Sequence, residues 1–206
     1  MTAVRNPTLT RAKILEAAFC AIHRDGFRSA GLESILESAG VTKGALYHHF
    51  PNKQALGYAL VDEVIRPAIL SRWVGPLEGS DNPLSAMVEN YRSLAKEFSE
   101  SSFGLGCPLN NLIQEMSPID EGFRTRLESV VQEWIRGVST ALGRGQKHGN
   151  VRADLDCKTT AAFIVAASEG VAGVMKTSPT KERLYEALEG LTGYLETLRP
   201  TEENPS

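Results

Sequence analysis

Residues 32–53 read LESILESAGVTKGALYHHFPNK, and this stretch decides the fold predicted for the beginning of the chain. It contains two short helical patterns separated by Gly40, a residue that suits the left-handed backbone of a tight turn. Thr42 is a favourable N-cap for the second helix, and Pro51 favours an end at Phe50. The stretch therefore predicts two helices joined by a tight turn.

The second of these helices has an unusual outward face. Leu46 and Phe50 share one side of the helix, whereas Gly44 and His48 lie on the opposite side. Ala45 and Tyr47 flank these outward residues, and Lys43 lies at the start of the helix. Such a face suits the major groove of DNA better than a protein core. A plain helical hairpin is the alternative, because glycine turns between helices are common.

Residues 39–53, AGVTKGALYHHFPNK, closely resemble the helix-turn-helix signature of the TetR family of bacterial transcriptional regulators. The resemblance covers about the first quarter of the chain. It implies an all-α fold with an N-terminal three-helix DNA-binding domain, residues 1–53, and a C-terminal effector-binding and dimerisation domain, residues 54–206. Leu36 departs from the family pattern, which usually has Ala there, and Ala30-Gly31 replaces a common Thr-Ser cap.

The resemblance also implies partners: a double-stranded, palindromic operator, a small-molecule effector that releases a repressor from it, and a second copy of the chain. We expect one group of residues to read bases and another, at helix starts, to hold phosphates. The predicted DNA-binding residues are Thr10, Arg11, Thr42, Lys43, Gly44, Tyr47, His48 and Lys53.

Charge is unevenly distributed along the 206 residues. The whole chain carries a net charge of −3, but residues 1–53 contain seven Lys or Arg against four acidic residues, which leaves −6 for the remainder. This asymmetry argues against a protein that coats nucleic acid and fits one that touches DNA at one end. No signal-peptide pattern is evident, and the most apolar run, residues 161–175, is too short to span a bilayer, so we expect a cytoplasmic protein without membrane contact.

The remainder of the chain is predicted to be helical, because no run alternates at the strand period. Pro67 is expected to kink the helix that contains it. The polar chain ends, residues 1–7 and 200–206, are expected to be frayed or disordered. The predicted helices span residues 8–25, 53–73, 82–102, 108–116, 120–144, 156–176 and 180–198.

The last two predicted helices carry small residues and a leucine stripe. These helices either complete the core of one chain or pair with the same helices of a second copy, and the residue pattern favours neither. The family resemblance favours a homodimer through a four-helix bundle. The predicted interface residues are Ala162, Ala166, Gly170, Leu184, Leu188, Leu191 and Leu195.

The sequence offers little catalytic chemistry. It has no glycine-rich phosphate loop or recognisable nucleophile–base motif, and the adjacent His48 and His49 face different sides of a helix, so neither an enzyme nor a metal or other cofactor is predicted. A helical enzyme or carrier, and an interaction module without a ligand, remain competing hypotheses. Aromatic residues of the second domain are individually typical of a core, but together with Cys107 and Asn111 they form a candidate effector pocket: Tyr91, Phe98, Phe103, Trp134 and Phe163.

Three cysteines without paired spacing indicate neither a disulfide framework nor a zinc site. Cys20 is expected to be a small packing residue. Cys107 precedes Pro108 and is the expected N-cap of a helix, where backbone amides favour a reactive thiolate. Residues 106–112 resemble a segment of a TetR-family subgroup in which some regulators sense electrophiles or oxidants, which makes a Cys107 sensor the alternative function. An inert thiol that closes a turn is the other possibility.

Overall fold

The computed structural model describes residues 7–201, apart from the side chain of Ser102. Its contacts divide the chain into two compact units: residues up to 67 together with 111–127, and residues 68–110 together with those from 128 onward. The described residues contain helices and no strand, as the all-α prediction requires. None of these helices is long and apolar enough to cross a membrane.

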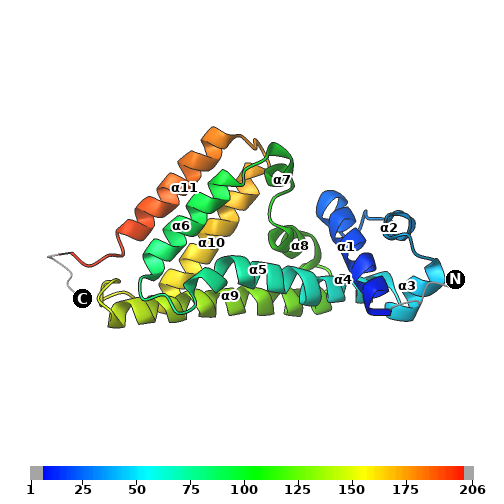
Figure 1. Ribbon diagram of the computed structural model, residues 1–206, viewed down its shortest axis with the longest axis horizontal. Coiled ribbons are helices and arrows are strands. Elements are labelled where there is room, and N and C mark those ends of the chain that lie inside the picture. The colour runs from blue at the N-terminus through cyan, green and yellow to red at the C-terminus, as the bar shows by residue number, and fades with distance from the viewer. Residues whose placement is uncertain (1–6, 202–206) are drawn as a thin grey trace. The chain divides into compact units, whose positions relative to one another are not determined.

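The first unit contains the predicted helix-turn-helix. It is built from α1 (Pro7–Asp25), α2 (Leu32–Ala39), α3 (Lys43–His49) and α4 (Lys53–Leu60), shown in Figure 1. Gly40 adopts φ +62° between α2 and α3, as the turn prediction requires. The side chains of Ile14, Ile35, Leu46 and Phe50 are at most 1% exposed. These apolar residues fix α1, α2 and α3 against one another.

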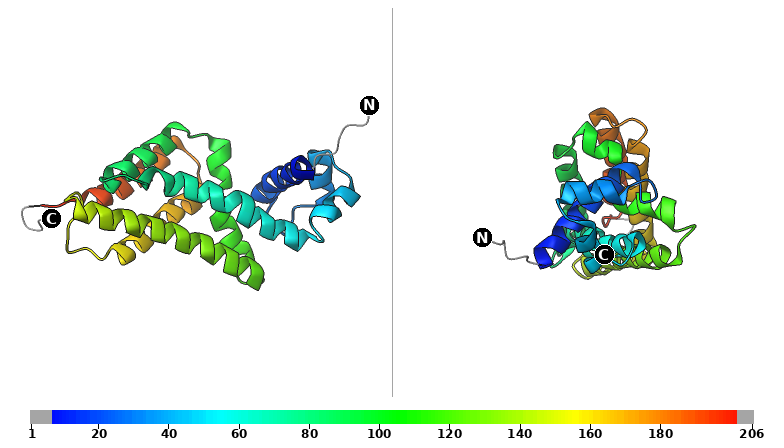
Figure 2. Two further views of the ribbon diagram at one scale, coloured as in Figure 1. Left: turned by 60° about the horizontal axis from the view of Figure 1, so that its bottom comes forward. Right: turned by 90° about the vertical axis from the view of Figure 1, so that its right-hand side faces the viewer.

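The helix predicted for residues 53–73 is divided into three segments. After α4 come the π-helical segment η1 (Val61–Ile65) and α5 (Arg66–Trp73), which follow one another without a loop (Figure 2). Pro67 has no N–H to donate, and its ring crowds the carbonyl four residues earlier. The wider π-helical turn ends at Ile65, two residues before this proline, so the expected irregularity is present as a change of helix type.

The second unit contains most of the remaining helices. They are η2 (Gly75–Leu77), α6 (Pro83–Lys96), α7 (Glu100–Leu105), α10 (Cys157–Met175) and α11 (Lys181–Glu196). Two further helices have one end in the first unit and the other end in the second: α8 (Pro108–Met116) and α9 (Glu121–Lys147). Within the second unit α11 packs against both α6 and α10. The side chains of Asn82, Asp156 and Thr180 cap α6, α10 and α11 by accepting backbone N–H groups.

The prediction of one helix from 82 to 102 is wrong. Helix α6 ends at Lys96, and α7 begins at Glu100 after a short turn. The ring centroids of Phe98 and Phe103 come within 4.9 Å of each other across this change of direction. Gly106 then ends α7 with φ +72°, near the predicted helix break.

The leucine part of the predicted dimer interface also needs correction. Leu184, Leu188, Leu191 and Leu195 are between 0% and 6% exposed, because they pack into the core of their own chain. A leucine stripe shows that a helix face is covered but does not identify what covers it. On α10, by contrast, Ala162, Ala166 and Gly170 are exposed and remain available to a second copy.

Candidate nucleic-acid interface

The outward face of α3 is polar, small and exposed, whereas its inward face is anchored in the core. Leu46 is fully buried, and Phe50, just after the helix, is 1% exposed. Thr42 begins the helix by accepting the N–H of Ala45 at 3.2 Å through its Oγ1. The predicted base-reading residues Thr42, Lys43, Gly44, Tyr47 and His48 are all exposed. The structure therefore brings this set together on one accessible surface.

Two hollows flank this surface within the first unit. One, of about 750 Å³, lies between the beginning of α1 and α3, and Thr10, Lys13 and His48 contribute to its lining. The other, of about 260 Å³, lies between α2 and α3, and Lys43 and Tyr47 contribute to it. Lys13 was not among the predicted contacts. Its outward position three residues after Thr10, on the same helix, is the sequence feature that would have identified it.

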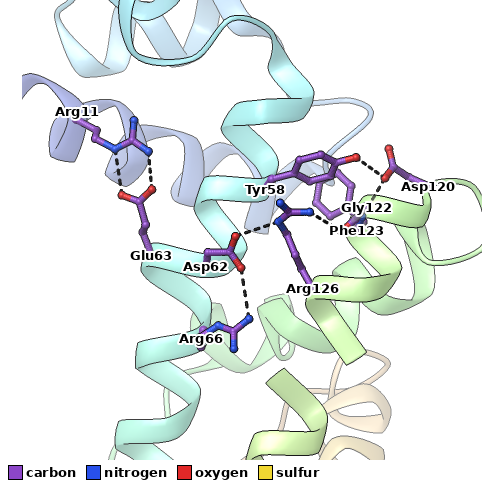
Figure 3. A network of polar contacts seen from close by, with 9 residues as sticks. All are labelled: Arg11, Tyr58, Asp62, Glu63, Arg66, Asp120, Gly122, Phe123 and Arg126. Atoms are coloured by element: carbon purple, nitrogen blue, oxygen red, sulfur yellow. Dashed lines mark hydrogen bonds and ion pairs between the residues drawn. The ribbon is translucent and has the colours of Figure 1, made fainter. Parts of the chain in front are cut away.

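Arg11 does not present its guanidinium freely to DNA. Its Nε donates to Oε2 of Glu63 at 3.1 Å, and a second nitrogen donates to the carbonyl of His49 at 3.3 Å (Figure 3 shows the Glu63 pair). The guanidinium also lies 4.3 Å from the centroid of the Phe50 ring. Arg11 thus joins α1 to η1 and to the end of α3. Partial burial, with the charges of His48 and Arg11, lowers the pKa of His49.

Lys53 is likewise engaged within the first unit. Its Nζ donates to the carbonyl of Arg28 at 3.1 Å and lies 5.1 Å from the centroid of the Phe27 ring. Burial lowers the pKa of this amine. Two of the predicted phosphate-binding cations, Arg11 and Lys53, therefore support the helix-turn-helix from within.

Figure 3 shows a polar network that joins α4 and η1 to the segment 111–127 within the first unit. The hydroxyl of Tyr58 donates to Oδ1 of Asp120 at 2.7 Å, and the N–H of Phe123 donates to the same oxygen at 2.9 Å. Arg126 donates from Nε to Oδ2 of Asp62 at 2.9 Å and lies 4.2 Å from the centroid of the Tyr58 ring. The first unit thus includes residues 111–127, which lie far along the chain from the helix-turn-helix.

The predicted effector residues of the second unit do not form one group. Tyr91 and Trp134 are 3% and 2% exposed, and Trp73 packs against both at 5.5 and 5.4 Å between ring centroids. Phe98 and Phe103 contact each other. Phe163 is 52% exposed and does not contact these aromatic rings; its ring lies 4.8 Å from that of Tyr194. Asn111 belongs to the first unit.

The second unit also has a groove of about 350 Å³ between α6 and α11. Tyr91, Ala95 and Leu188 contribute apolar side chains to it, and Arg92 and Lys96 contribute charged ones. Elsewhere in this unit, two buried polar atoms lack a hydrogen-bond partner among the described residues, Nη2 of Arg72 and Oε2 of Glu169. Such unpaired atoms are costly in a folded protein and call for a physical explanation.

Cys107 is held inside the second unit. Its Sγ donates to Oε1 of Glu169 at 3.3 Å. Burial, together with the negative charge of Glu169, raises the pKa of the Cys107 thiol despite the backbone N–H groups of Leu109 and Asn110. Of the two alternatives for Cys107, burial and the raised pKa favour the inert thiol. Cys20, expected to pack inside, is exposed.

Comparisons with known proteins assign both parts of the chain. Residues 14–60 match the family model described as bacterial regulatory proteins of the tetR family, and residues 82–191 match the tetracyclin repressor-like C-terminal domain. The HTH-type transcriptional repressor DhaR of Mycobacterium sp. (strain GP1) is 28% identical over 97% of both chains. The transcriptional regulator AcuR of Cereibacter sphaeroides is 30% identical over 72% of this chain and 68% of its own.

Solved structures agree with these relatives. The reduced form of NemR from E. coli is 25% identical with a TM-score of 0.80, and covers 93% of this chain and 98% of its own. A regulatory protein TetR from Rhodobacter sphaeroides is 26% identical with a TM-score of 0.78, over 90% and 98% of the two chains. The helix-turn-helix geometry, the two family models and these relatives lead to one conclusion: the chain belongs to the TetR family and is a DNA-binding transcriptional regulator.

Proposed function

We propose that the protein is a repressor that binds a palindromic operator as a homodimer and leaves it when a small-molecule effector binds. The observation that carries the proposal is the outward face of α3, where five exposed residues lie over a fully buried Leu46. In this proposal α3 enters the major groove and contacts base edges. The base-contacting set is Thr42, Lys43, Gly44, Tyr47 and His48.

The phosphate contacts are assigned differently from the sequence prediction. Thr10 and Lys13 line the hollow beside α3, so we propose that they meet the DNA backbone there. Arg11 and Lys53 instead hold α3 and the α1–α2 turn in place through their contacts with Glu63 and Arg28. Their substitution would then weaken DNA binding indirectly, by loosening the unit.

A homodimer would use the outer faces of α10 and α11. The exposed residues Ala162, Ala166 and Gly170 recur at four-residue spacing on α10, and the exposed ring of Phe163 lies 4.8 Å from that of Tyr194 on α11. Small residues allow helices of two copies to approach closely, and a two-fold interface matches a palindromic operator. The buried leucines would support this face from below.

The second unit is proposed to hold the effector. An effector with its own polar groups would form hydrogen bonds with Nη2 of Arg72 and Oε2 of Glu169, which are buried without a partner among the described residues. The effector would bind more tightly to a conformation in which the two α3 helices of the dimer are wrongly spaced for the operator. It would thereby shift the population away from the DNA-binding state. The relative DhaR is named a transcriptional repressor, which supports repression as the direction of control. The protein would act in the cytoplasm by binding and not by catalysis.

Selection of DNA from a random pool by the purified protein tests this function. We expect an inverted repeat to be enriched, a complex of two chains per site, and binding that weakens steeply with salt because cation–phosphate contacts release counterions. Enrichment of no specific sequence would contradict the proposal. A thermal-shift screen identifies small molecules that bind the protein. Measuring whether these molecules release the selected DNA then tests the effector part of the proposal separately.

A further inference from the structure

The turn that leads into the helix-turn-helix is held by a carboxylate from α8. Oε2 of Glu115 accepts the N–H of Phe27 at 2.7 Å, and Oε1 accepts the N–H of Arg28 at 2.8 Å. Gly26 precedes these residues with φ +85°, and a Cβ placed on it would lie 3.1 Å from Oε2 of Glu115. The backbone of the turn is therefore shaped around this one side chain, which lies 87 or 88 residues further along the chain.

No neighbouring side chain holds the end of this turn, at the beginning of α2. Gly31, the N-cap of α2, has no side chain to cap the helix, and no side-chain hydrogen bond is made at this cap. The turn is instead fixed by Glu115, by Lys53 on the carbonyl of Arg28, and by the packing of Phe27 against Phe123 at 4.7 Å between ring centroids. Hydrogen bonds to a carboxylate are stronger than those between neutral groups. Glu115 is thus a principal constraint on the direction in which α2 and α3 leave α1.

The opposite end of α8 is fastened in the second unit. Nδ2 of Asn110 donates to the backbone carbonyl of Glu169 at 3.1 Å, and the thiol of Cys107, next to the helix, donates to the carboxylate of the same residue. Between Asn110 and Glu115 the chain is an uninterrupted α-helix that rises about 1.5 Å per residue. Helix α8 therefore contributes a residue to each unit: Asn110 contacts α10 within the second unit, and Glu115 holds the α1–α2 turn within the first.

We propose that Glu115 is a positioning residue for operator binding, which holds the helix-turn-helix in its DNA-reading conformation. A movement of α8 imposed through its contacts with Glu169 would withdraw the carboxylate from the N–H groups of Phe27 and Arg28. The turn would then lose one of its three constraints while keeping Lys53 and the Phe27–Phe123 contact, and α3 would no longer be held in one orientation. This inference rests on the proposed function and names the side chain through which the second unit acts on DNA binding.

The test compares Glu115→Gln with Glu121→Gln on the operator that the parent protein selects. Both variants remove one negative charge from the first unit, which by long-range electrostatics alone would tighten DNA binding. Glu121 is exposed and pairs with Arg124, so it serves as the matched control. We expect Glu115→Gln to weaken operator binding about tenfold, since it weakens charge-assisted hydrogen bonds. The control should bind as tightly as the parent or slightly more tightly.

A second variant and a second measurement separate positioning from general stability. Glu115→Asp keeps the charge but shortens the reach, so it should also weaken operator binding. In both variants amide hydrogen exchange should accelerate at Phe27 and Arg28, while the amides of the buried core of α1 remain as slow as in the parent. Operator binding by both variants equal to that of the parent would overturn the inference. Failure of the parent itself to select an operator would instead overturn the proposed function.

Discussion

The thiol of Cys107 donates a hydrogen bond to the carboxylate of Glu169 at 3.3 Å, and the other carboxylate oxygen is buried without a partner among the described residues. The negative charge of Glu169 makes ionisation of the thiol less favourable, whereas the hydrogen bond from the thiol partly offsets the effect of burial on the carboxylate. Burial raises the pKa of Glu169 to about 7 and raises that of the thiol as well. The pair therefore favours a protonated thiol at neutral pH, which is the opposite of a cysteine activated by a helix start.

Alkylation of the native protein should proceed at Cys20 before Cys107. Cys20 is exposed, whereas the Cys107 thiol is buried against Glu169. With limiting iodoacetamide, peptide mass spectrometry should find label on Cys20 first, and Cys107 should become labelled readily only in denaturant. Preferential labelling of Cys107 in the native state, with release of DNA, would instead support a function as an electrophile sensor.

Glu169→Gln should change how stability depends on pH. The pKa of Glu169 is raised to about 7 in the folded chain, above the unfolded value of about 4.3, so the folded state binds the extra proton between these values. The free energy of unfolding therefore falls as the pH rises from about 4 to 7, and the penalty is complete above that range. Glu169→Gln lacks this penalty because it has no carboxylate to ionise. The melting temperature of the variant minus that of the parent should therefore increase from pH 5 to pH 8.

The size of this effect is limited to about 4 kcal/mol, because the two pKa values differ by about 2.7 units and one unit corresponds to about 1.4 kcal/mol. Glu189→Gln, at an exposed position of α11, is the matched control and should show little change with pH. A difference between Glu169→Gln and the parent that stays constant across the range would contradict the assignment.

Gly57→Ala should destabilise the first unit. A Cβ on Gly57 would lie 2.5 Å from ring atoms of both Phe27 and Phe123, closer than packed atoms approach. Overpacking of this kind costs about 1–3 kcal/mol. Gly143→Ala is the matched control in α9, where nothing lies within 4 Å, and should stabilise by up to about 1 kcal/mol through helix propensity. Thermal melts with equal effects for the two variants would refute the close packing at Gly57.

Two substitutions should separate the dimer face from the monomer core. Ala166→Arg places a charge on the exposed face of α10 and should give folded monomers with weak operator binding. Leu188→Glu places a carboxylate at a site only 5% exposed, and should lower the melting temperature strongly because a buried charge is unpaired there. Circular dichroism and analytical ultracentrifugation distinguish these outcomes. A fully dimeric Ala166→Arg variant would move the interface elsewhere.

Local sequence chemistry was sufficient for the helix-turn-helix. The left-handed glycine at 40 and the cap at Thr42 depend only on neighbouring residues, and both are present in the structure. The π-helical turn before Pro67 was expected only as a kink, because sequence indicates the lost hydrogen bond but not how the backbone accommodates it.

Contacts between distant segments were beyond sequence reasoning. Glu115 meets the turn at Phe27 from far along the chain, and Arg11 meets Glu63 across 52 residues. Without those partners, Arg11 was indistinguishable from a free phosphate-binding cation. Sequence left the acidity of Cys107 open for the same reason, because it showed the helix amides but not Glu169.

The central claim is that the outward face of α3 reads the operator. The most direct test is the affinity of the double variant Lys43→Ala, Tyr47→Ala for DNA selected by the parent, measured by fluorescence anisotropy. Both side chains are exposed, so the fold should persist. The matched control is Lys147→Ala, Tyr185→Ala, which removes an exposed lysine and a 49% exposed tyrosine from the second unit.

We predict that the α3 variant binds the selected operator at least roughly 100-fold more weakly than the parent. Each lost base contact costs about 1–3 kcal/mol, and the substitutions affect the α3 helices of both chains in a dimer. The control should retain the affinity of the parent. Operator binding by the α3 variant as tight as that of the parent would contradict the account.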